Sequence, residues 1–362
     1  MRLLHVTTSL VQGGSEGYLR RIVPEIAKRG ISQHVVSLVA GGYHAEGLKA
    51  EGIPVTELGL RRGVPDPRGI LRLRQLIAEF QPAVVQGWLY HANLLALVAN
   101  SVVSKAIRPK LIWGIRSAEM DQTRYGLSLR VAVNGSAMLS RIPDCIVANS
   151  EVGKADHIRL GFCDERFHVI ANGVDVERFH PDAAARQEVR RELGIESDAV
   201  IAGVFARNDP MKNLDDILRV VGQADGFHTL FAGQGTDQLP ASARCHFMGA
   251  RSDVSRLMAA CDFTVLASKS EGFPNVVAES LSCGVPVVTA DVGDAARIVG
   301  DAGQVFGAED WNGLLAALRT YAVMEPSERA RLGKMGRQRV VEDFSLERSV
   351  ANFVQLYESL NA

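Results

Sequence analysis

The sequence is short of several features that would assign it to a common class. It has no uninterrupted apolar run of the ~20 residues that a membrane-spanning helix needs, and MRLLHVTTSLVQGG at its start is too polar after Leu10 for a secretory signal. It has no CxxC pair, and its five cysteines are widely scattered, namely Cys145, Cys163, Cys245, Cys261 and Cys283. This pattern argues against a zinc site or a disulfide framework and predicts a protein of the reducing cytoplasm.

Catalytic and cofactor motifs of several enzyme classes are absent too. There is no D-x-D run, no His/Asp cluster with metal-ligand spacing and no nucleophile elbow for Ser-His-Asp catalysis. The full G-x-G-x-x-G fingerprint of a dinucleotide site is missing as well. These absences leave a metal site and a dinucleotide cofactor without support from the residues, and no cofactor is expected.

The length, composition and charge of the chain indicate its general class. A chain of 362 residues with 47% apolar and 22% charged residues predicts a globular protein of two domains. The net charge of −1 is unevenly spread: residues 1–180 hold 22 Lys and Arg against 16 Asp and Glu, and the rest hold 18 against 25. The first half includes a group of close arginines, which suits either a peripheral contact with an anionic membrane surface or a solvated helical face: Arg61, Arg62, Arg68, Arg72 and Arg74.

Short apolar runs alternate with helical patterns in both halves. Buried strands are expected in the first half at 3–8, 34–39, 83–86, 111–113, 145–148 and 168–171, and in the second at 199–205, 228–233, 261–268 and 286–290. This alternation predicts an α/β fold of parallel sheets covered on both faces.

A polar segment in the middle of the chain indicates where the two domains meet. The polar segment 175–195 suggests a boundary, which divides the chain into domains 1–178 and 179–344. An amphipathic helix at 345–360 has Val350, Phe353, Val354 and Leu356 as candidates for its buried face.

Gly13 and Gly14 follow the first strand, and Ser15 is a candidate N-cap for the helix after them. A glycine pair at this point lets the backbone approach a phosphate at a helix N-terminus, although such pairs are also common as purely structural turns. The helix itself shows Leu19, Ile22, Val23 and Ile26 at helical spacing, with Pro24 predicting a bend or a late start.

The loop ARNDPMKN (206–213) follows the first strand of the second half. Arg207 and Lys212 would project at the carboxyl end of this strand, where open parallel sheets bind ligands. A guanidinium fork and an ammonium suit a diphosphate. The alternative is a solvated turn, because Asp209-Pro210 favours a turn in any protein.

The stretch SEGFPNVVAES (270–280) holds two glutamates, Glu271 and Glu279, with seven residues between them. Gly272-Phe273-Pro274 breaks the chain after a strand, and Pro274 suits the first turn of a helix. Carboxylates bind hydroxyl groups and helix amides bind anions, so the pattern predicts a ligand with phosphate and polyol parts. Otherwise Glu271 is simply exposed, and Glu279 is a favourable acid near a helix start.

Weaker signals stand at other strand ends. His91 follows the strand at 83–86, although a lone histidine is more often structural than catalytic. Asn172 lies in ANGVD after the strand at 168–171, and Gly233 and Gly235 follow the strand at 228–233. FMGARSDV (247–254), with Met248 and Arg251, offers backbone groups to a base.

Together these segments resemble the retaining group 1 glycosyltransferase family with the E-x7-E motif. SEGFPNVVAESLSCGVPVV carries that motif, and VIANGVDVERFHP is similar to the family's passage between domains, with Ala171 where proline is common. ARNDPMKN, HVTTSLVQGGSE and DVGDAARIVGDAG (291–303) resemble further family segments in order along the chain. The resemblance implies the GT-B fold, with two Rossmann-like β/α/β domains facing a central cleft and the helix at 345–362 packing back on the first domain.

The resemblance also implies roles for individual residues. The first domain would bind the acceptor and the second a nucleotide-sugar donor, without a divalent metal. Glu271 would contact the donor sugar, Glu279 the ribose, and Arg207 and Lys212 the leaving diphosphate, with His91 near the sugar. The remaining donor-binding positions are Gly13, Gly14, Asn172, Gly233, Met248, Arg251, Gly272, Phe273, Pro274, Asn275 and Val276.

The function implied is transfer of a hexose or N-acetylhexosamine, with retention, to a glycan or lipid-linked acceptor in cell-surface polysaccharide biosynthesis. A UDP-sugar is favoured as donor, and a location at the inner membrane face fits the basic first half. Two alternatives stay open: a sugar-nucleotide epimerase of the same fold, distinguished by turnover of UDP-GlcNAc without acceptor, and a non-catalytic nucleotide-sugar-binding protein.

Overall fold

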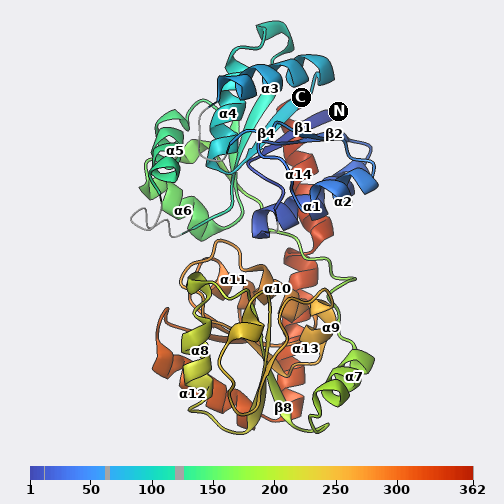
Figure 1. The fold of residues 1–362 in the computed structure, drawn as a ribbon, viewed down its shortest axis with the longest axis vertical. Helices are drawn as coiled ribbons and strands as arrows, with labels where there is room; N and C mark the ends of the chain where they lie inside the picture. Colours follow the sequence, from blue (N-terminus) through green and yellow to red (C-terminus); the bar gives the residue numbers. More distant parts are fainter. Residues whose placement is uncertain (12, 62–65, 119–125, 362) are drawn as a thin grey trace. The chain divides into compact units, whose positions relative to one another are not determined.

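The computed structural model describes residues 1–362 except 12, 62–65, 119–125 and 362. It divides into two compact units, Met1–Gly173 with Glu347–Ala362, and Val174–Leu346. Figure 1 shows the helices of each unit packed around that unit's own sheet. Arg62, one of the arginines noted in the sequence, lies outside the described residues.

The first unit is built on a seven-stranded sheet in the order β3-β2-β1-β4-β5-β6-β7, in which every pairing is parallel. The strands are β1 Arg2–Thr7, β2 Ser32–Ser37, β3 Val55–Glu57, β4 Val84–Trp88, β5 Lys110–Ile115, β6 Cys145–Ala148 and β7 Phe167–Val169. The apolar runs predicted all of these except β3. That strand has three half-buried residues at a sheet edge, which is too little apolar sequence to detect.

The connecting helices are α1 Gly14–Ala27, α2 Ala45–Ala50, α3 Pro67–Phe80, α4 Tyr90–Ser101, α5 Leu127–Leu139, α6 Glu151–Arg159 and α14 Leu346–Asn361, with short 3-10 turns η1 Lys105–Ile107 and η3 Asp164–Arg166. The expected N-cap at Ser15 is wrong, because Gly13 is the N-cap and α1 begins at Gly14, two residues earlier than a cap at Ser15 would place it. Pro24 lies inside α1.

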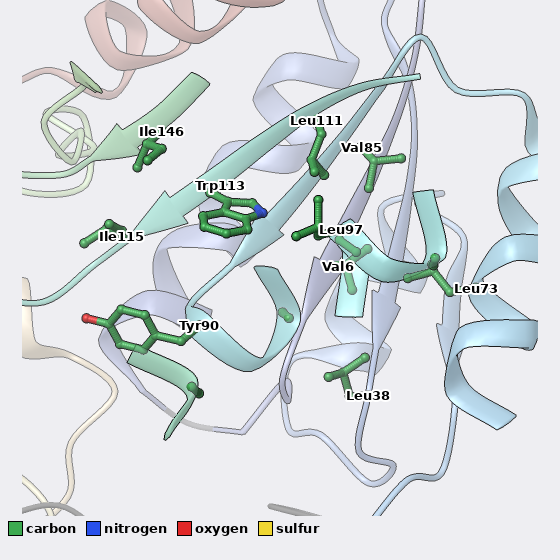
Figure 2. Packing of buried hydrophobic residues seen from close by; sticks show 14 of the residues in the cluster. Val6, Leu38, Leu73, Val85, Tyr90, Leu97, Leu111, Trp113, Ile115 and Ile146 are labelled. Carbon is green, nitrogen blue, oxygen red and sulfur yellow. The ribbon is translucent and has the colours of Figure 1, made fainter. Parts of the chain in front are cut away.

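The main core of the first unit lies between one face of the sheet and helices α3, α4 and α5. Figure 2 shows Val6, Val85, Leu111 and Trp113 of the strands directed toward the same cluster as Leu73 and Leu97 of the helices. Strands β1, β5 and β6 contribute alternate residues to this face, as the two-residue period of a strand requires. Its other face is left for α1 and α14.

Helix α14 supplies the aromatic packing on that other face. Phe353 stacks on Trp88 of β4 with ring centroids 6.5 Å apart, and the Tyr357 hydroxyl donates to Gln86 Oε1. Val350, Phe353 and Leu356 are buried as predicted, whereas Val354 is only half-buried and Tyr357 takes the inward position instead.

The second unit contains a six-stranded parallel sheet in the order β10-β9-β8-β11-β12-β13. Its strands are β8 Val200–Phe205, β9 Phe227–Ala232, β10 Cys245–Phe247, β11 Phe263–Leu266, β12 Val287–Ala290 and β13 Gly303–Phe306. The sequence predicted the four central strands, whereas the edge strands β10 and β13 are mostly half-buried and were missed.

Its helices are α7 Ala183–Leu193, α8 Leu214–Val221, α9 Val254–Ala259, α10 Asn275–Ser282, α11 Ala295–Val299, α12 Trp311–Val323 and α13 Pro326–Asp343, with 3-10 turns η4 Pro210–Lys212 and η5 Thr236–Gln238. The polar segment 175–195 contains α7 and belongs to this unit.

A carboxylate just before β11, with its side chain only 9% exposed, joins this sheet to two helices. Asp262 lies 2.7 Å from guanidinium nitrogens of both Arg186 and Arg190 in α7, and 3.7 Å from Arg329 Nε in α13. The backbone N–H of Ile201 also donates to it, at 2.9 Å. Because a buried charge is tolerated only when it is paired and hydrogen-bonded, these contacts fix α7 and α13 at this end of the sheet.

Candidate functional site

The topology of the second sheet brings the two strongest sequence signals to one place. From the neighbouring strands β8 and β11 the chain continues in opposite directions across the sheet. The loop after β8 carries Arg207 and Lys212, and the loop after β11 carries Glu271. Ligands of open α/β sheets bind at such a switch point, beyond the carboxyl ends of the strands.

Lys212 and Glu271 are in direct contact. Lys212 Nζ lies 2.5 Å from Glu271 Oε1, with the two side chains 23% and 16% exposed. An ammonium has three donors, and this carboxylate accepts from one of them. The pair therefore combines positive charge and an acceptor oxygen in one partly buried position, which suits a ligand with phosphate and hydroxyl groups.

The loop after β8 is fixed by its own polar residues. The Asp209 side chain accepts from the N–H of Met211 at 2.9 Å and starts the turn η4, which ends at Lys212. Asn213 adopts a left-handed conformation with φ 53° and donates its side-chain amide to Ala267 O at 2.8 Å. These bonds position Lys212 beside the loop that follows β11.

Arg207 lies on the solvent side of the same loop. Its side chain is 54% exposed, and its Nε lies 3.2 Å from Asp209 Oδ2. Asp209 thus starts the turn and also pairs with Arg207. The sequence pattern predicted only the turn. An exposed guanidinium beside Lys212 extends the positive charge toward an incoming anion.

The break at Gly272-Phe273-Pro274 leads directly into α10, and all three residues are buried. Pro274 is the N-cap rather than a first-turn residue, so Asn275 begins the helix. Phe273 packs against Phe344, with ring centroids 5.7 Å apart. Val276 and Glu279 are half-buried on α10, which follows the Glu271 loop without any intervening residue.

A glycine that sequence reasoning did not single out holds the backbone of the Glu271 loop. Gly293 has φ +54°, and a Cβ at this position would lie 2.3 Å from the carbonyl oxygen of Glu271 and 2.4 Å from that of Gly272. The N–H of Asp294 donates to Gly272 O at 3.0 Å. Only glycine satisfies both the left-handed backbone and this close approach.

The loops after β9 and β10 pack against the loop after β8. Gly233 has φ +151°, its N–H donates to Gly249 O at 2.8 Å, and a Cβ on it would lie 2.0 Å from Ala206 O. Gly235 lies in the same loop, with φ +81°. Close backbone approach thus explains Gly233, and the left-handed backbone explains Gly235.

Met248 and Arg251, proposed as contacts for a base, are both engaged within the unit. The N–H of Met248 donates to Phe231 O at 2.8 Å. Arg251 makes two bonds of 2.8 Å to the Asp253 carboxylate. The Met248 N–H is thus used in the sheet, whereas the Arg251 guanidinium is held rigidly at the strand end.

The first unit has a similar switch point between β1 and β4. Gly13 and Gly14 follow β1, and His91 lies at the start of α4 after β4. A Cβ on Gly13 would lie 2.6 Å from the Glu16 carboxylate, whereas one on Gly14 would meet no atom within 4 Å. Gly14 is therefore the position at which the backbone is open to a ligand.

His91 is half-buried, and its Nε2 lies 3.1 Å from Ser128 Oγ of α5. The turn before it contains Leu89 with φ 71°, a strained conformation for a branched side chain. The N–H of Leu89 donates to Gly114 O at 3.0 Å, which holds this conformation. Neither Leu89 nor Ser128 carries a sequence signal that would have identified it.

Asn172 belongs to the first unit, where it is buried. Its Oδ1 accepts from Arg116 Nη1 at 2.9 Å, and the Arg116 guanidinium lies over the rings of Trp88 and Tyr18, 4.4 and 4.9 Å from their centroids. Burial lowers the pKa of Arg116 to about 10. This side chain holds the loop of Asn172 against the aromatic cluster of α1 and β4.

No group of three or more His, Cys, Asp or Glu side chains among the described residues is arranged to hold a metal ion. None of the helices in the described part of the chain is both long enough and apolar enough to cross a bilayer.

Comparison with solved structures defines the class of fold. HepE from Anabaena, solved in complex with UDP, superposes with a TM-score of 0.85 at 22% identity, over 99% of this chain and 100% of that one. Sucrose-phosphate synthase from Thermosynechococcus elongatus gives 0.82 at 18% identity, over 99% of each chain. With its two parallel α/β sheets, the chain has the two-domain GT-B fold.

Family models give the more specific assignment. Residues 185–339 match the model described as glycosyl transferases group 1, and residues 12–178 match glycosyltransferase family 4. The chain therefore belongs to the group 1 glycosyltransferases.

Among curated relatives, D-inositol 3-phosphate glycosyltransferase of Mycobacterium marinum is 31% identical over 41% of this chain and 35% of its own length. The chain spans about a third to a half of the length of the first curated relatives it matches. The lipopolysaccharide core mannosyltransferase LpcC of Rhizobium leguminosarum bv. viciae aligns over 94% of this chain and 96% of its own length at 25% identity.

Proposed function

We propose that this protein is a retaining glycosyltransferase that moves a hexose or N-acetylhexosamine from a UDP-sugar to a glycan or lipid-linked acceptor. The observation that carries the proposal is the contact between Lys212 and Glu271 at the switch point of the second sheet. The UDP and UDP-glucose complexes of the Anabaena neighbour support the choice of donor. Relatives named for lipopolysaccharide core synthesis support a role in building cell-surface glycans.

The chemistry follows from the charges in this site. Departure of the nucleoside diphosphate develops negative charge on its oxygens, and Lys212 and Arg207 stabilise that charge as fixed cations. The proposed reaction uses these cations in place of a divalent metal. Glu271 accepts hydrogen bonds from donor-sugar hydroxyls and Glu279 from the ribose, so neither is the nucleophile. The acceptor hydroxyl then attacks the anomeric carbon on the face that the diphosphate leaves. The bond from this carbon to the acceptor oxygen forms, the bond to the phosphate oxygen breaks, and the departing diphosphate takes the hydroxyl proton. Attack on this face retains the anomeric configuration.

The first experiment is a thermal-shift series with UDP, UDP-glucose, UDP-GlcNAc and GDP-mannose, each with EDTA and with magnesium. A donor that binds the folded state raises the melting temperature by mass action. We expect a UDP-sugar to give the largest rise, equal in EDTA and magnesium. A rise with GDP-mannose alone would mean that the donor is GDP-mannose and not a UDP-sugar. A rise only with magnesium would contradict metal-independent binding.

The second experiment separates transfer from the other activities of this fold. The protein is incubated with the donor that it binds, with and without a lipid-linked oligosaccharide. The release of UDP and the configuration of the new linkage are then measured. Acceptor-dependent release with retention supports the proposal. Conversion of UDP-GlcNAc without acceptor would identify an epimerase, and binding without any turnover a nucleotide-sugar-binding protein.

A further inference from the structure

Helix α5 of the first unit has its hydrophobic face turned outward. Five of the sixteen exposed large hydrophobic side chains among the described residues lie between 127 and 142, namely Leu127, Val131, Met138, Leu139 and Ile142. The helix buries mainly small residues in their place: Ala132, Val133, Ser136 and Ala137. A surface helix of a globular protein normally buries its largest apolar residues and exposes polar ones.

Three of these residues form one stripe along α5, whereas Leu139 lies on another side of the helix and Ile142 follows its end. At 100° per residue, Leu127, Val131 and Met138 lie within about 40° of one another. Val131 is 62% exposed and Met138 is 86% exposed. Figure 1 shows α5 at the left margin of the first unit, beside α4. An apolar stripe of this kind indicates a surface that binds something.

The charge around the stripe selects the kind of partner. Arg130 on α5 and Arg141 just after its end are exposed, and residues 126–143 contain no Asp or Glu, although the Glu165 carboxylate lies within electrostatic reach of Arg141. A symmetric contact with a second copy would bring these arginines together without a carboxylate from this helix to offset them. Large apolar side chains flanked by cations, with no acid in the helix itself, are the composition of helices that lie in the interface of an anionic bilayer.

The stripe begins next to the candidate site of the first unit. Leu127 immediately precedes Ser128, whose hydroxyl is 3.1 Å from His91 Nε2. Helices α4 and α5 continue side by side, since a Cβ on Gly135 would lie 3.9 Å from Leu94 Cδ1. A bilayer that contacts α5 would therefore lie close to His91, which stands at the start of α4 beyond the carboxyl end of β4.

The arginines at 61–74 suggested membrane contact from the sequence, but the structure uses most of those described elsewhere. Arg68 pairs with Asp66 at 2.7 Å, Arg72 donates to Leu58 O at 2.7 Å, and Arg74 donates to Val102 O at 3.2 Å. This leaves α5 as the better-supported surface.

We infer that the exposed stripe of α5, with Arg130 and Arg141, docks this protein on an anionic lipid bilayer. The apolar side chains enter the boundary between headgroups and acyl chains, and the arginines contact lipid phosphates. This inference is independent of the donor and of the transfer reaction, because docking needs neither.

The test is co-sedimentation of the full chain with phosphatidylcholine vesicles, with and without phosphatidylglycerol. We expect binding only with phosphatidylglycerol, and weaker binding at high salt, which screens the arginines. Arg130→Gln/Arg141→Gln should weaken binding about fivefold for each arginine. Val131→Gln/Met138→Gln should weaken it about tenfold or more.

Matched controls come from exposed helices of the second unit. Val323→Gln on α12, where Val323 is 82% exposed, and Arg191→Gln on α7 should bind like the wild type. Circular dichroism of every variant verifies folding. Wild-type protein that stays in the supernatant with anionic vesicles overturns the inference. So does a wild-type dimer in light scattering that Val131→Gln/Met138→Gln converts to monomer, because a second copy would then cover the stripe.

Discussion

Lys212 Nζ and Glu271 Oε1 lie 2.5 Å apart although 59 positions separate the two residues in the chain. The contact exists because β8 and β11 are parallel neighbours in the sheet, so the loops that follow them leave the sheet at the same edge. If this pair is the centre of the donor site, Lys212→Ala and Glu271→Gln should each lower kcat/KM for sugar transfer about 100- to 1000-fold. Lys212→Ala removes a cation that stabilises the developing charge, and Glu271→Gln removes the carboxylate that pairs with Lys212 and accepts from the donor sugar.

The control for this prediction is an ion pair of the same unit away from the switch point. Arg219 and Asp216 of α8 lie 3.1 Å apart, with side chains 52% and 41% exposed. Arg219→Ala should leave the transfer rate unchanged, because exposed pairs of this kind contribute little. Full transfer activity in both Lys212→Ala and Glu271→Gln would show that the site lies elsewhere.

Gly293 should be required for the shape of the Glu271 loop. Gly293→Ala introduces a methyl group 2.3 Å from Glu271 O, so the loop must move and donor-induced stabilisation should disappear. Gly194→Ala is the matched variant, because Gly194 has φ +65° and its Cβ would meet no atom within 4 Å. Both variants introduce left-handed strain of about 1–2 kcal/mol, but only the first should lose the thermal shift with donor. An equal shift in both would contradict this role of Gly293.

Asp262 should be the most important buried charge of the second unit. Asp262→Asn leaves Arg190, whose side chain is 4% exposed, without its carboxylate partner. We expect a loss of about 3–5 kcal/mol in the free energy of unfolding of this unit, measured by urea titration. Asp225→Asn removes the 92%-exposed partner of Arg244 and should cost about 0–1 kcal/mol. Similar losses in the two variants would rule out a special role for the buried cluster.

His5 should make the first unit less stable in acid. Its Nδ1 accepts from Trp88 Nε1 at 3.2 Å and its Nε2 lies 2.8 Å from Gln33 Oε1, which fits a neutral ring with its proton on Nε2. Burial lowers the pKa of His5 to about 4, from 6.5 for the free side chain.

The sign of the effect follows from proton binding. Between pH 6.5 and 4 the unfolded chain binds a proton that the folded unit does not, so stability falls as the pH falls through this window. The total contribution is about 3 kcal/mol, all of it present above pH 6.5. Urea unfolding followed by tryptophan fluorescence across this window measures it. His180→Gln, at an exposed position, should keep the full slope, whereas His5→Gln should reduce it.

Much of the architecture follows from the sequence because buried parallel strands are continuous apolar runs. The ten runs identified as strands all appear in the two sheets, whereas β3, β10 and β13 do not show in the pattern. These three lie at sheet edges and are mainly half-buried, so selection for apolar residues is weak there. Helix starts were less accurate: Gly13 rather than Ser15 caps α1, because the glycine adopts the extended conformation that the cap requires.

The sequence by itself determined which residue types stand at the ends of the central strands: glycine pairs, two cations, and two glutamates around a proline. Those identities are local, and each follows from the chemistry of a turn, a helix start or a ligand group. Tertiary structure alone decided that Lys212 meets Glu271, that Gly293 supports the same loop and that Asn172 is bonded to Arg116. It also decided that α5 shows its large apolar residues to solvent. Such contacts depend on the order of the strands and on which face of a helix meets the sheet. The spacing of residues that lie tens of positions apart in the chain does not reveal either of these.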